Sequence, residues 1–588
     1  MGYKPLLMMK HWRTLQPDNQ LVQSLSAKLP CHPVTASVLI NRGITSTRAA
    51  GAYLRSSLNQ LKTPFGIKDI DTAVQRIGQA IDSREKIRIF GDYDVDGVTA
   101  TLVLYEFLTS CGAEVAYTIP HRLNEGYGLQ PLHIHRFTAS DRPDLLITAD
   151  CGTGSIEAVR EANRSGIEVI VTDHHSLSGP LPDAVAVVNP KRPDCNAGFE
   201  QLAGVGVALS LVICLRKHLR DGGFWRSRPQ PNLRELCDLV ALGTLADGVP
   251  LTGDNRVLVR TGLEVIRNGK NRAGLSTLID RCKCKPDDIG TEEIAYRLIP
   301  RLNAAGRMDS ASLAAALLTT SDLEEAARMA DVLEALNERR RQVEGEILRE
   351  CRAHLLADPA NLQKSALVLS RKNWHGGVLG IVAARLAERH HRPVVLISVQ
   401  QGLGTGSGRS IDGIDITGCL AACAQHLEGY GGHAMAAGVR VMENNLGKFR
   451  EAFEKQVLSL TTDVESAPEV IIDCELALSD ISDALIDEIE SLEPYGAGNP
   501  NPLFRANDLQ VRQSQIVGGA HRRMLLCHSG GTRQRSIGAI QFNVDPDKSL
   551  PDAFDRVAFR LQWNRWNGRK VAQLVIEEAV SLQEASQR

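Results

Sequence analysis

Residues 87–97 read IRIFGDYDVDG, an apolar run followed at once by three aspartates at alternate positions. The run is short and rich in isoleucine, which is typical of a strand buried on both faces of a parallel sheet. Asp92, Asp94 and Asp96 would then lie at the carboxyl end of that strand, where open α/β sheets bind their ligands. Carboxylates this close repel one another unless cations lie between them. By itself, DYDVDG fits a calcium-binding or solvated acidic turn equally well.

The same pattern of an apolar run followed by polar side chains recurs further along the chain. DLLITAD ends at Asp150, and IEVIVTD ends at Asp173 and is followed by His174 and His175. Three successive strands would therefore bring carboxylates and imidazoles to one edge of one sheet. Core packing does not account for the Asp-His-His triplet, because its burial without partners would cost several kcal/mol. Asp247, which follows the apolar run of LVALGTLAD, is a fourth candidate, although alone it would fit a helix cap.

A mixed set of aspartates and histidines is typical of a site for divalent cations. The excess of oxygen ligands favours Mn²⁺ or Mg²⁺. Two such ions about 3.5 to 4 Å apart can activate a water molecule and stabilise the leaving oxygen of a phosphodiester. The sequence therefore predicts phosphoester hydrolysis with two divalent metal ions, Mn²⁺ or Mg²⁺, as cofactors.

The segments around these strands indicate the fold class. From about residue 86 to 188, short β-branched runs alternate with amphipathic segments, which predicts βαβ units and a parallel sheet. Residues 322–356 are rich in Ala, Leu, Glu and Arg and lack proline, so they predict one helix of roughly 50 Å. A second α/β segment follows. Near the end of the chain, alternating runs flank Asn567-Gly568, which indicates a hairpin in a small antiparallel barrel.

Length and composition limit the class of protein. With 588 residues, 43% of them hydrophobic, about three or four domains are expected. The 67 lysines and arginines nearly balance the 69 aspartates and glutamates, so an anionic substrate must be held by local arginines or by metal. The thirteen cysteines form no paired zinc or disulfide framework. The start of the sequence has no apolar stretch of signal-peptide length, and the longest apolar stretch, residues 203–215, is too short for a membrane helix, so we expect a cytoplasmic protein without membrane contact.

The motifs resemble those of a known enzyme superfamily. DYDVDG, the aspartate of ITAD, DHH and ADGVPL have the order and spacing of motifs one to four of the DHH phosphoesterases. Further stretches are similar to the RecJ nucleases of that superfamily, namely PHRLNEGYGL, LAGVGVALSL, PRLNAAGRM, WHGGVLGIVAARLAERHHRPV, GSGRSIDG, GGHAMAAG and, near the end, GAGNPNPLF. Cys151, Thr153 and Gly248 depart from the family pattern, but none of these changes removes an expected ligand.

The resemblance implies a role for each acidic and histidine residue. The expected catalytic set divides into direct metal ligands and residues that orient them or polarise the phosphate. The direct ligands would be Asp94, Asp96, Asp150, His174 and Asp247, and the others Asp92, Asp173 and His175.

The resemblance also implies substrate contacts outside the acidic motifs. Arg122, Arg307, Arg409, Ser410 and His433 would bind phosphate, the last three from a glycine-rich domain that closes over the substrate. Each arginine would also fit an interdomain ion pair, and the glycines would also fit simple turns.

In the terminal barrel, base stacking on tryptophan is the expected mode of strand binding. Trp563 and Trp566 would stack on single strands beside Arg565, Arg569 and Lys570, although each tryptophan fits packing of the barrel equally well.

The implied architecture is α/β, with a parallel-sheet DHH domain, a long connecting helix, a second α/β DHH-associated domain and a C-terminal OB-like β-barrel. The expected boundaries are 1–59 for an N-terminal extension, 60–321 for the DHH catalytic domain, 322–356 for the helix, 357–460 for the substrate-binding domain and 467–588 for the single-strand-binding domain. The implied activity is hydrolysis of single-stranded DNA from its 5′ end to mononucleotides, in DNA repair and recombination. The implied partners are single-stranded DNA, single-strand-binding protein and a helicase, and the implied state is a monomer.

Two other functions stay open at this point. A small-substrate DHH phosphodiesterase or oligoribonuclease would hold metals in the same way, although the extra barrel after residue 467 favours a longer polymer. A degenerate DHH protein would serve as a structural partner in replication. Such proteins have lost acidic ligands, whereas all four motifs keep theirs here.

Overall fold

The computed structural model describes residues 11–177, 179–269, 271–461, 469–529, 536–545, 550–566 and 569–581. The chain divides into two compact units, each made of segments that are separate in the sequence. The larger unit comprises residues 62–249 and 261–465, and the smaller comprises residues 1–61, 250–260 and 466–588. No helix in the described part of the chain is long and apolar enough to cross a lipid bilayer.

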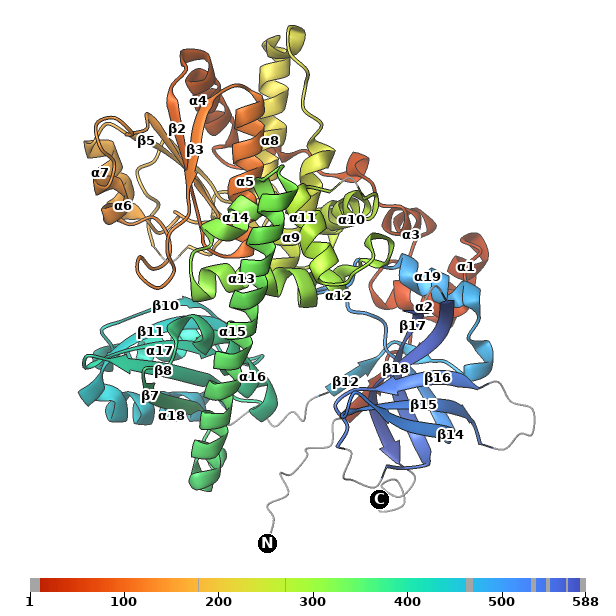
Figure 1. Cartoon of the computed structure of the whole chain (residues 1–588). Coiled ribbons are helices and arrows are strands. Elements are labelled where there is room, and N and C mark those ends of the chain that lie inside the picture. The colour runs from red at the N-terminus through yellow and green to blue at the C-terminus, as the bar shows by residue number, and fades with distance from the viewer. Residues whose placement is uncertain are drawn as a thin grey trace. The chain divides into compact units, whose positions relative to one another are not determined.

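The larger unit begins with a five-stranded parallel sheet in the order β3-β2-β4-β5-β6 (Figure 1). Its strands are β2 (Lys86–Gly91), β3 (Glu114–Thr118), β4 (Leu145–Ala149), β5 (Glu168–Thr172) and β6 (Ala186–Val188). The chain leaves β2 for β3 on one side and then crosses to β4 on the other. The switch in direction lies between β2 and β4, at whose carboxyl ends open α/β sheets bind ligands.

Helices cover both faces of this sheet. The helices α4 (Ile70–Ser83), α5 (Val95–Ser110) and α8 (Gly204–Asp221) pack together on one face, and α6 (Pro131–His135) and α7 (Ile156–Arg164) cover the other (Figure 1). The strands read as nearly continuous apolar runs because both of their faces are buried. The structure thus has the predicted parallel α/β domain.

A helical region connects this sheet to a second one. It contains α9 (Cys237–Asp247), α10 (Gly253–Arg267), α11 (Ala273–Arg281), α12 (Thr291–Glu293), α13 (Ile299–Met308), α14 (Ser312–Thr319) and the long helix α15 (Leu323–Ala357). Asp322 caps α15 by accepting hydrogen bonds from the backbone N–H groups of Glu324 and Glu325. The observed helix therefore agrees to within a residue at each end with the one expected at 322–356.

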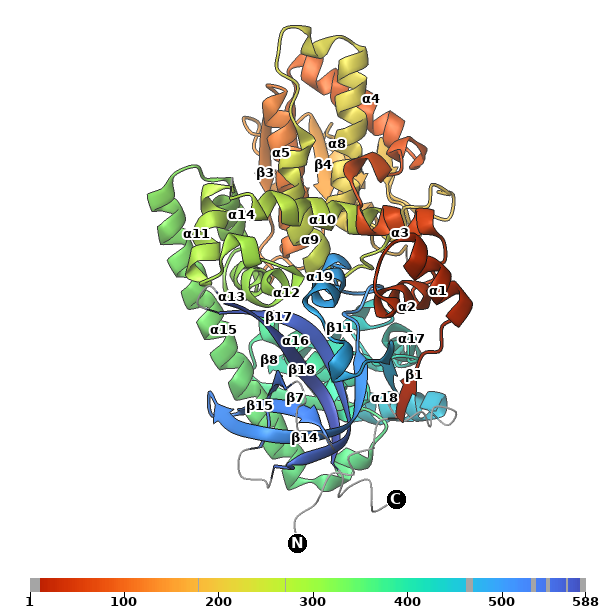
Figure 2. The same cartoon turned by 90° about the vertical axis from the view of Figure 1, so that its right-hand side faces the viewer.

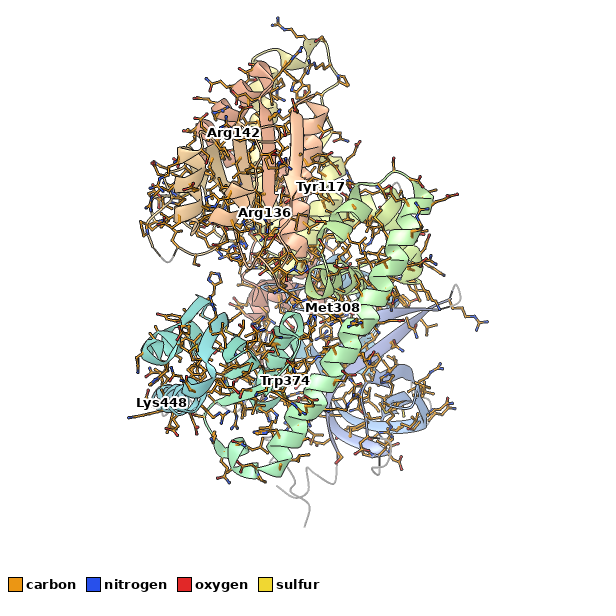
Figure 3. The ribbon with its side chains drawn as sticks, turned by 60° about the vertical axis from the view of Figure 1, so that its left-hand side comes forward. Tyr117, Arg136, Arg142, Met308, Trp374 and Lys448 are labelled. Carbon is orange, nitrogen blue, oxygen red and sulfur yellow. The ribbon has the colours of Figure 1, made fainter. Side chains whose placement is uncertain are left out.

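The second sheet of the larger unit is mixed, in the order β10-β11-β9-β8-β7. Its strands are β7 (Leu367–Lys372), β8 (Val394–Gln400), β9 (Leu403–Arg409), β10 (Gly429–His433) and β11 (Ala436–Met442), with helices α16 (Gly376–His390), α17 (Ile416–Ala422) and α18 (Leu446–Thr461). The indole N–H of Trp374, labelled in Figure 3, donates to Glu350 of α15 at 2.7 Å. The long helix is thereby fastened to the second domain.

The smaller unit is built on a β-barrel (Figure 2). Its strands follow the order β13-β14-β15-β16-β18-β17, and β17 pairs again with β14, which closes the barrel. They are β13 (Cys474–Glu475), β14 (Phe504–Val517), β15 (His521–His528), β16 (Ile537–Gln541), β17 (Ala553–Trp566) and β18 (Arg569–Ser581). The predicted turn Asn567-Gly568 lies outside the described residues, but the strands beside it pair antiparallel, with Trp566 opposite Arg569.

Residues expected to form a separate N-terminal extension belong to the barrel unit. The helices α1 (Asn19–Lys28), α2 (Pro33–Asn41) and α3 (Thr47–Leu54) share one hydrophobic core with the barrel and with α19 (Asp483–Ser491). Strand β1 (His11–Thr14) pairs in parallel with β12 (Glu469–Ile472). This pairing joins residues from opposite ends of the chain, which a local sequence pattern does not reveal.

Candidate metal centre

Three aspartates follow the carboxyl ends of three adjacent strands of the parallel sheet. Asp92, Asp150 and Asp173 come directly after β2, β4 and β5 and are each 2–3% exposed. The backbone of Asp150 is left-handed (φ 63°), a conformation that aspartate tolerates better than most residues. Parallel strands therefore gather the three carboxyl groups at one edge, as their spacing in the sequence predicts.

Helix α5 contributes two more carboxylates. Asp94 caps the helix by accepting the backbone N–H of Gly97 at 3.0 Å. Asp96, in the first turn, accepts the backbone N–H groups of Gly204 and Val205 at 2.7 and 2.9 Å. The free N–H groups at the start of α8 thus hold the Asp96 carboxylate, as helix N-termini hold anions.

Glycines allow the close approaches at this edge. A Cβ atom at Gly97 would lie 2.6 Å from the Asp92 Cβ, and one at Gly204 would lie 2.3 Å from the Asp150 Oδ1. At Gly243 of α9, a Cβ atom would lie 2.8 Å from the Asp96 Oδ1. Any larger residue at these positions would displace a carboxylate.

His174 lies at the centre of the cluster. Its Nε2 is 3.2 Å from the Asp150 Oδ1, 3.8 Å from the Asp247 Oδ2 and 3.9 Å from the Asp96 Oδ2. Asp247, the last residue of α9, therefore reaches the same edge as the strand-end residues.

Several buried polar atoms of the cluster lack hydrogen bonds. The Oδ1 atoms of Asp92 and Asp150 and the Nε2 of His174 have no partner of suitable geometry among the described residues. An unsatisfied buried polar group is costly, so these atoms are accounted for if a cation binds them.

The donor atoms form three overlapping groups, within each of which all atoms lie within 4.8 Å of one another. The groups are Asp150, His174 and His175; Asp96, His174 and Asp247; and Asp92, Asp94 and Asp150. Because the groups share members, they suit a pair of neighbouring ions better than one isolated ion. The donor set, mostly carboxylate with imidazole, fits Mn²⁺ or Mg²⁺.

The pKa values of these side chains also indicate a site for cations. Burial and neighbouring carboxylates raise the pKa values of Asp92, Asp96 and Asp150 well above the ordinary value, and they raise the pKa of Asp247 to about 6. Burial lowers the pKa of His174 to about 3, so its ring is neutral and able to act as a ligand at neutral pH. Without a cation, the carboxylates destabilise one another.

Asp173 holds the second histidine. Its Oδ1 accepts the backbone N–H groups of His174 and His175 and contacts the His175 Nδ1 at 2.8 Å. Burial lowers the pKa of His175, but the hydrogen bond and charge of Asp173 outweigh it and raise the pKa to about 9. At neutral pH the His175 ring is therefore a cationic donor at the edge of the cluster.

Three arginines expected to contact phosphate lie near one another, and we call them the arginine cluster. Arg307 donates to the carbonyl of Gly377 in the first turn of α16, and Arg409 donates to the Ser407 Oγ at 2.9 Å. Arg122 lies over the ring of Tyr93, with its Cζ 4.5 Å from the ring centroid. Burial and the charges of Arg122 and Arg409 lower the pKa of Arg307. Mutual repulsion of this kind makes the arginine cluster attractive to an anion.

The alternative of interdomain ion pairs for these arginines is wrong for the described residues. Arg122, Arg307 and Arg409 form no ion pair with a carboxylate in the described ranges, so their charges remain available. Ser410 also differs from expectation. Its buried hydroxyl donates to the carbonyl of Ile414 at 2.6 Å and shapes the loop after β9. Ser407, which the sequence reasoning missed, provides the hydroxyl beside Arg409.

His433 and Tyr127, a residue that was not among the expected site residues, lie against His175. The rings of His433 and His175 are stacked, and the hydroxyl of Tyr127 is 3.0 Å from the His175 Nδ1. Tyr127 is 45% exposed despite this contact. The only sequence signal for it was its place in PHRLNEGYGL.

The stacking role expected for Trp563 does not fit the barrel. Trp563 is 7% exposed, and its indole N–H donates to Asp487 at 2.8 Å. Lys570 covers the ring and pairs with the same carboxylate, while Arg565 pairs with Glu490. Trp563 packs the barrel, and the side chain of Trp566 lies outside the described residues. An exposed aromatic ring is instead found at Phe542 (49% exposed), against His521.

Comparison with known proteins gives three matching families. The DHH family, N-terminal domain, matches residues 86–244, the DHHA1 domain matches 363–459, and the RecJ OB domain matches 472–578. The chain is 33% identical to a single-stranded-DNA-specific exonuclease RecJ of Bacillus subtilis over 97% of this chain and 70% of the relative. It is 35% identical to that of Salmonella typhimurium over 94% of this chain and 96% of the relative.

Solved structures agree with these relatives. The structure of RecJ from Thermus thermophilus in complex with Mn²⁺ superimposes with a TM-score of 0.80 at 31% identity, covering 97% of this chain and 79% of that one. Its complex with Mg²⁺ gives a TM-score of 0.75 at 30% identity, over 97% and 78% of the two chains. Both structural similarities cover nearly the whole of this chain.

Proposed function

The chain belongs to the RecJ family of single-stranded-DNA-specific exonucleases, and we propose that it hydrolyses single-stranded DNA from the 5′ end with Mn²⁺ or Mg²⁺ at the aspartate and histidine cluster. One observation carries the assignment of the site: an acidic cluster able to bind cations adjoins, in one unit, a cluster of three arginines able to bind an anion. Tyr93 links the acidic residues to the arginines. It lies between Asp92 and Asp94 in the sequence, and the Arg122 guanidinium lies over its ring.

The arginine cluster supports a start at the 5′ end. A terminal phosphate brings up to two negative charges and three acceptor oxygens, which suit forked guanidinium donors. Arg122, Arg307 and Arg409 would hold that phosphate beside the start of α16, where backbone N–H groups add to the attraction. The next phosphodiester of the strand would then lie toward the acidic cluster.

Each residue of the cluster has a distinct task in this proposal. Asp94, Asp96, Asp150, His174 and Asp247 would hold the metal ions, and Asp92 would orient them. When bound, such cations provide a nucleophile from water at neutral pH and offset the charge on the phosphate. The cationic ring of His175, held by Asp173, would donate a hydrogen bond to the phosphate, with His433 stacked on its outer face.

The same proposal gives each domain a function. We assign hydrolysis to residues 60–321, the connection to the helix at 322–356, closure over the substrate to 357–460 and strand binding to the barrel at 467–588. In the barrel, Phe542 and His521 replace Trp563 as the surface on which a base stacks. Partnership with single-strand-binding protein and a helicase, a monomeric state, a cytoplasmic location and a role in repair and recombination are proposed from family membership alone.

A small-substrate phosphodiesterase fits these observations less well. Such an enzyme acts on a short substrate and has no use for a separate barrel that binds a long strand.

An end-labelling assay tests the proposed function. Purified protein with Mn²⁺ or Mg²⁺ is given single-stranded DNA labelled at the 5′ or the 3′ end, together with duplex DNA, RNA and a cyclic dinucleotide. We expect labelled mononucleotide to appear at once from 5′-labelled single strands and only late from 3′-labelled ones. Early release from the 3′ end, or preference for the cyclic dinucleotide, would refute the proposal.

A matched pair of variants tests the site. Asp96→Ala should lower turnover at least about 10³-fold, because it removes a carboxylate from the group that Asp96 forms with His174 and Asp247. Asp71→Ala is the control, since Asp71 also lies in the first turn of a helix, α4, but away from the cluster. Retention of more than about a tenth of wild-type activity by Asp96→Ala at saturating Mn²⁺ would exclude Asp96 from the metal site.

A further inference from the structure

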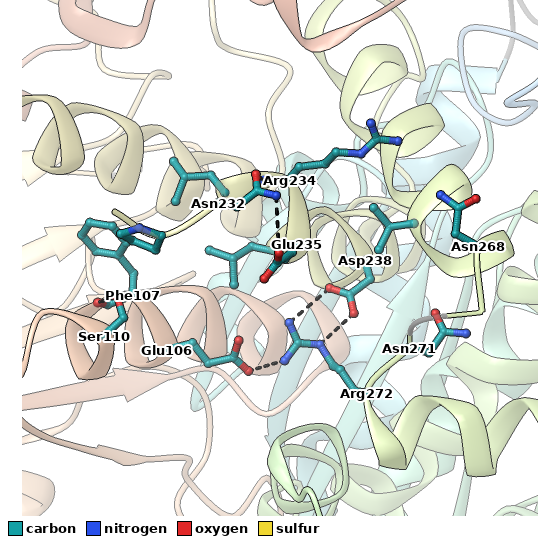
Figure 4. Close-up of a pocket in the computed structure, with 14 residues that line it drawn as sticks. Glu106, Phe107, Ser110, Asn232, Arg234, Glu235, Asp238, Asn268, Asn271 and Arg272 are labelled. Atoms are coloured by element: carbon teal, nitrogen blue, oxygen red, sulfur yellow. Dashed lines mark hydrogen bonds and ion pairs between the residues drawn. The ribbon is translucent and has the colours of Figure 1, made fainter. Parts of the chain in front are cut away.

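A part-buried arginine joins the two helices that carry metal-site residues. Arg272, directly before α11, donates from Nε and Nη2 to both carboxylate oxygens of Asp238, at 2.7 and 3.2 Å, and from Nη1 to Glu106 (Figure 4). Its side chain is only 16% exposed, and that of Asp238 is 3% exposed. We call these three side chains the Arg272 clamp.

The clamp and the metal cluster lie at opposite ends of the same helix pair. Glu106 is in α5, ten residues after Asp96, and Asp238 is in α9, nine residues before Asp247. At 1.5 Å per residue, the separations along the helices are roughly 15 Å and 14 Å. Because Asp96 and Asp247 both approach His174, the helices run antiparallel, and their other ends meet at Arg272.

A second contact fixes the helix pair near the cluster. Gly243 of α9 packs so closely on α5 that a Cβ atom there would lie 2.3 Å from the Thr99 Oγ1. With this close contact at one end and the clamp at the other, the angle between α5 and α9 is defined. If the clamp were lost, α9 could pivot about Gly243, and Asp247 would move relative to Asp96.

The clamp borders an open space on one side. A cavity of about 750 Å³ lies beside it, bordered by Phe107, Pro231, Asn232, Asn268 and Asn271 as well as the clamp residues. Figure 4 shows the guanidinium of Arg272 between its two carboxylates beside this space. Close packing, which elsewhere fixes core side chains, is therefore incomplete on this side.

The cluster itself supplies the force that the clamp resists. Asp96 at the start of α5 and Asp247 at the end of α9 bring their carboxyl groups within 4 Å of the same atom, the Nε2 of His174. Repulsion between the ends of α5 and α9 would open the site before a cation arrives.

We propose that Arg272 is a positioning residue for the metal centre: by clamping Glu106 to Asp238, it holds α5 and α9 at the spacing that Asp96 and Asp247 need to bind divalent cations. The inference rests on the proposed function, because it takes the aspartate and histidine cluster as the metal site. Arg272 does not contact the cluster and acts only through the two helices.

The test measures Mn²⁺ binding to the metal-stripped protein by calorimetry, for the wild type and for Arg272→Ala. The control is Arg76→Ala. Arg76 is also a part-buried guanidinium (11% exposed) shared by two carboxylates, Glu85 and Glu168, but it joins α4 to the amino ends of strands, away from the cluster. Both variants lose similar ion pairs, so a general loss of stability would affect them alike.

We expect Arg272→Ala to weaken Mn²⁺ binding about tenfold and Arg76→Ala to leave it within about twofold of the wild type. Turnover by Arg272→Ala should fall at low Mn²⁺ and recover as Mn²⁺ is raised, with an unchanged KM for single-stranded DNA. Arg272→Lys, which can still pair with one carboxylate, should restore part of the affinity.

If Arg272→Ala does not fold, the double variant Arg272→Ala with Asp238→Asn leaves no buried charge unpaired, and Glu106→Gln removes one arm of the clamp. Wild-type Mn²⁺ affinity in the folded variants would overturn the inference while leaving the proposed function intact. Failure of the wild type itself to bind Mn²⁺ would instead overturn the proposed function.

Discussion

The imidazole ring of His433 is stacked on that of His175, with centroids 5.5 Å apart and ring planes 17° apart. His433 ends β10 of the second sheet, whereas His175 follows β5 of the parallel sheet. The second sheet therefore contributes a side chain directly at the edge of the metal cluster. A substrate phosphate at that edge would meet both domains of the larger unit.

His433→Ala should lower kcat/KM on single-stranded DNA about 10- to 100-fold, because one N–H donor near the phosphate is lost. His433→Phe separates two roles, since phenylalanine keeps a flat ring on His175 but has no N–H group. We expect both variants to lose activity to a similar degree while Mn²⁺ affinity stays unchanged. Full activity of His433→Phe in steady-state assays would contradict a donor role and leave only stacking.

Arg307→Ala should abolish most of the preference for a 5′-phosphate over a 5′-hydroxyl end, since a charged group with no carboxylate partner in the described ranges is removed. Arg301→Ala is a control from the same helix, α13, because Arg301 is paired with Glu334. The measurement compares initial rates on 5′-phosphorylated, 5′-hydroxyl and 5′-blocked strands. Equal rates on all three substrates with the wild-type protein would count against phosphate binding by the arginine cluster.

Stability without metal should fall as the pH rises from about 6.5 to about 9. The pKa of His175 is raised from 6.5 to about 9, so the stability it contributes is complete below 6.5 and is lost as the pH passes through 9. The raised pKa values of Asp92, Asp96 and Asp150 act in the same direction. His174, with a pKa lowered to about 3, has the opposite effect, but only below 6.5.

Thermal unfolding in a chelator and in Mn²⁺ tests this expectation across the same pH range. Cations bind the ionised carboxylates, so the increase in Tm that Mn²⁺ gives should grow with pH. A Tm of the metal-free protein that stays constant or rises between about pH 6.5 and 9 would contradict the assignment of the cluster.

Phe542→Ala should weaken binding to a forty-nucleotide single strand, since stacking contributes about 1 to 3 kcal/mol per base. Hydrolysis of a four-nucleotide strand should be unchanged. Trp563→Ala gives the contrast: truncation of a buried aromatic residue costs roughly 3 to 5 kcal/mol, so it should lower the Tm of the barrel. Fluorescence anisotropy and calorimetry measure the two effects, and equal affinity of Phe542→Ala and the wild type for the long strand would exclude Phe542 from the binding surface.

The metal cluster was predictable because it depends on a local rule. Asp92, Asp150 and Asp173 each end an apolar run, and neighbouring parallel strands end at the same edge. The alternation of side chains along a strand explains why the expectations for Trp563 and Ser410 differ from the structure. Phe559, Leu561 and Trp563 alternate along β17 and are all buried, and Ser407 shares a face of β9 with Arg409, whereas Ser410 lies beyond the strand.

Other features depend on contacts between distant residues and left little trace in the sequence. Neither the pairing of β1 with β12 nor the junction of Glu106, Asp238 and Arg272 can be inferred from spacing, because each requires the relative positions of elements in space. The amides of Gly204 and Val205 hold Asp96 through backbone atoms, which any residue carries.

The discontinuous barrel unit has a consequence for biosynthesis. Its core unites Val22, Leu25 and Leu39 with Phe504 and Phe559, so α1 and α2 cannot complete their packing until β14 and β17 have been translated. During that interval their apolar faces stay uncovered and open to chaperones. Removing residues 467–588 would make this exposure permanent. A minimal nuclease should therefore lack α1, α2 and α3 as well as the barrel.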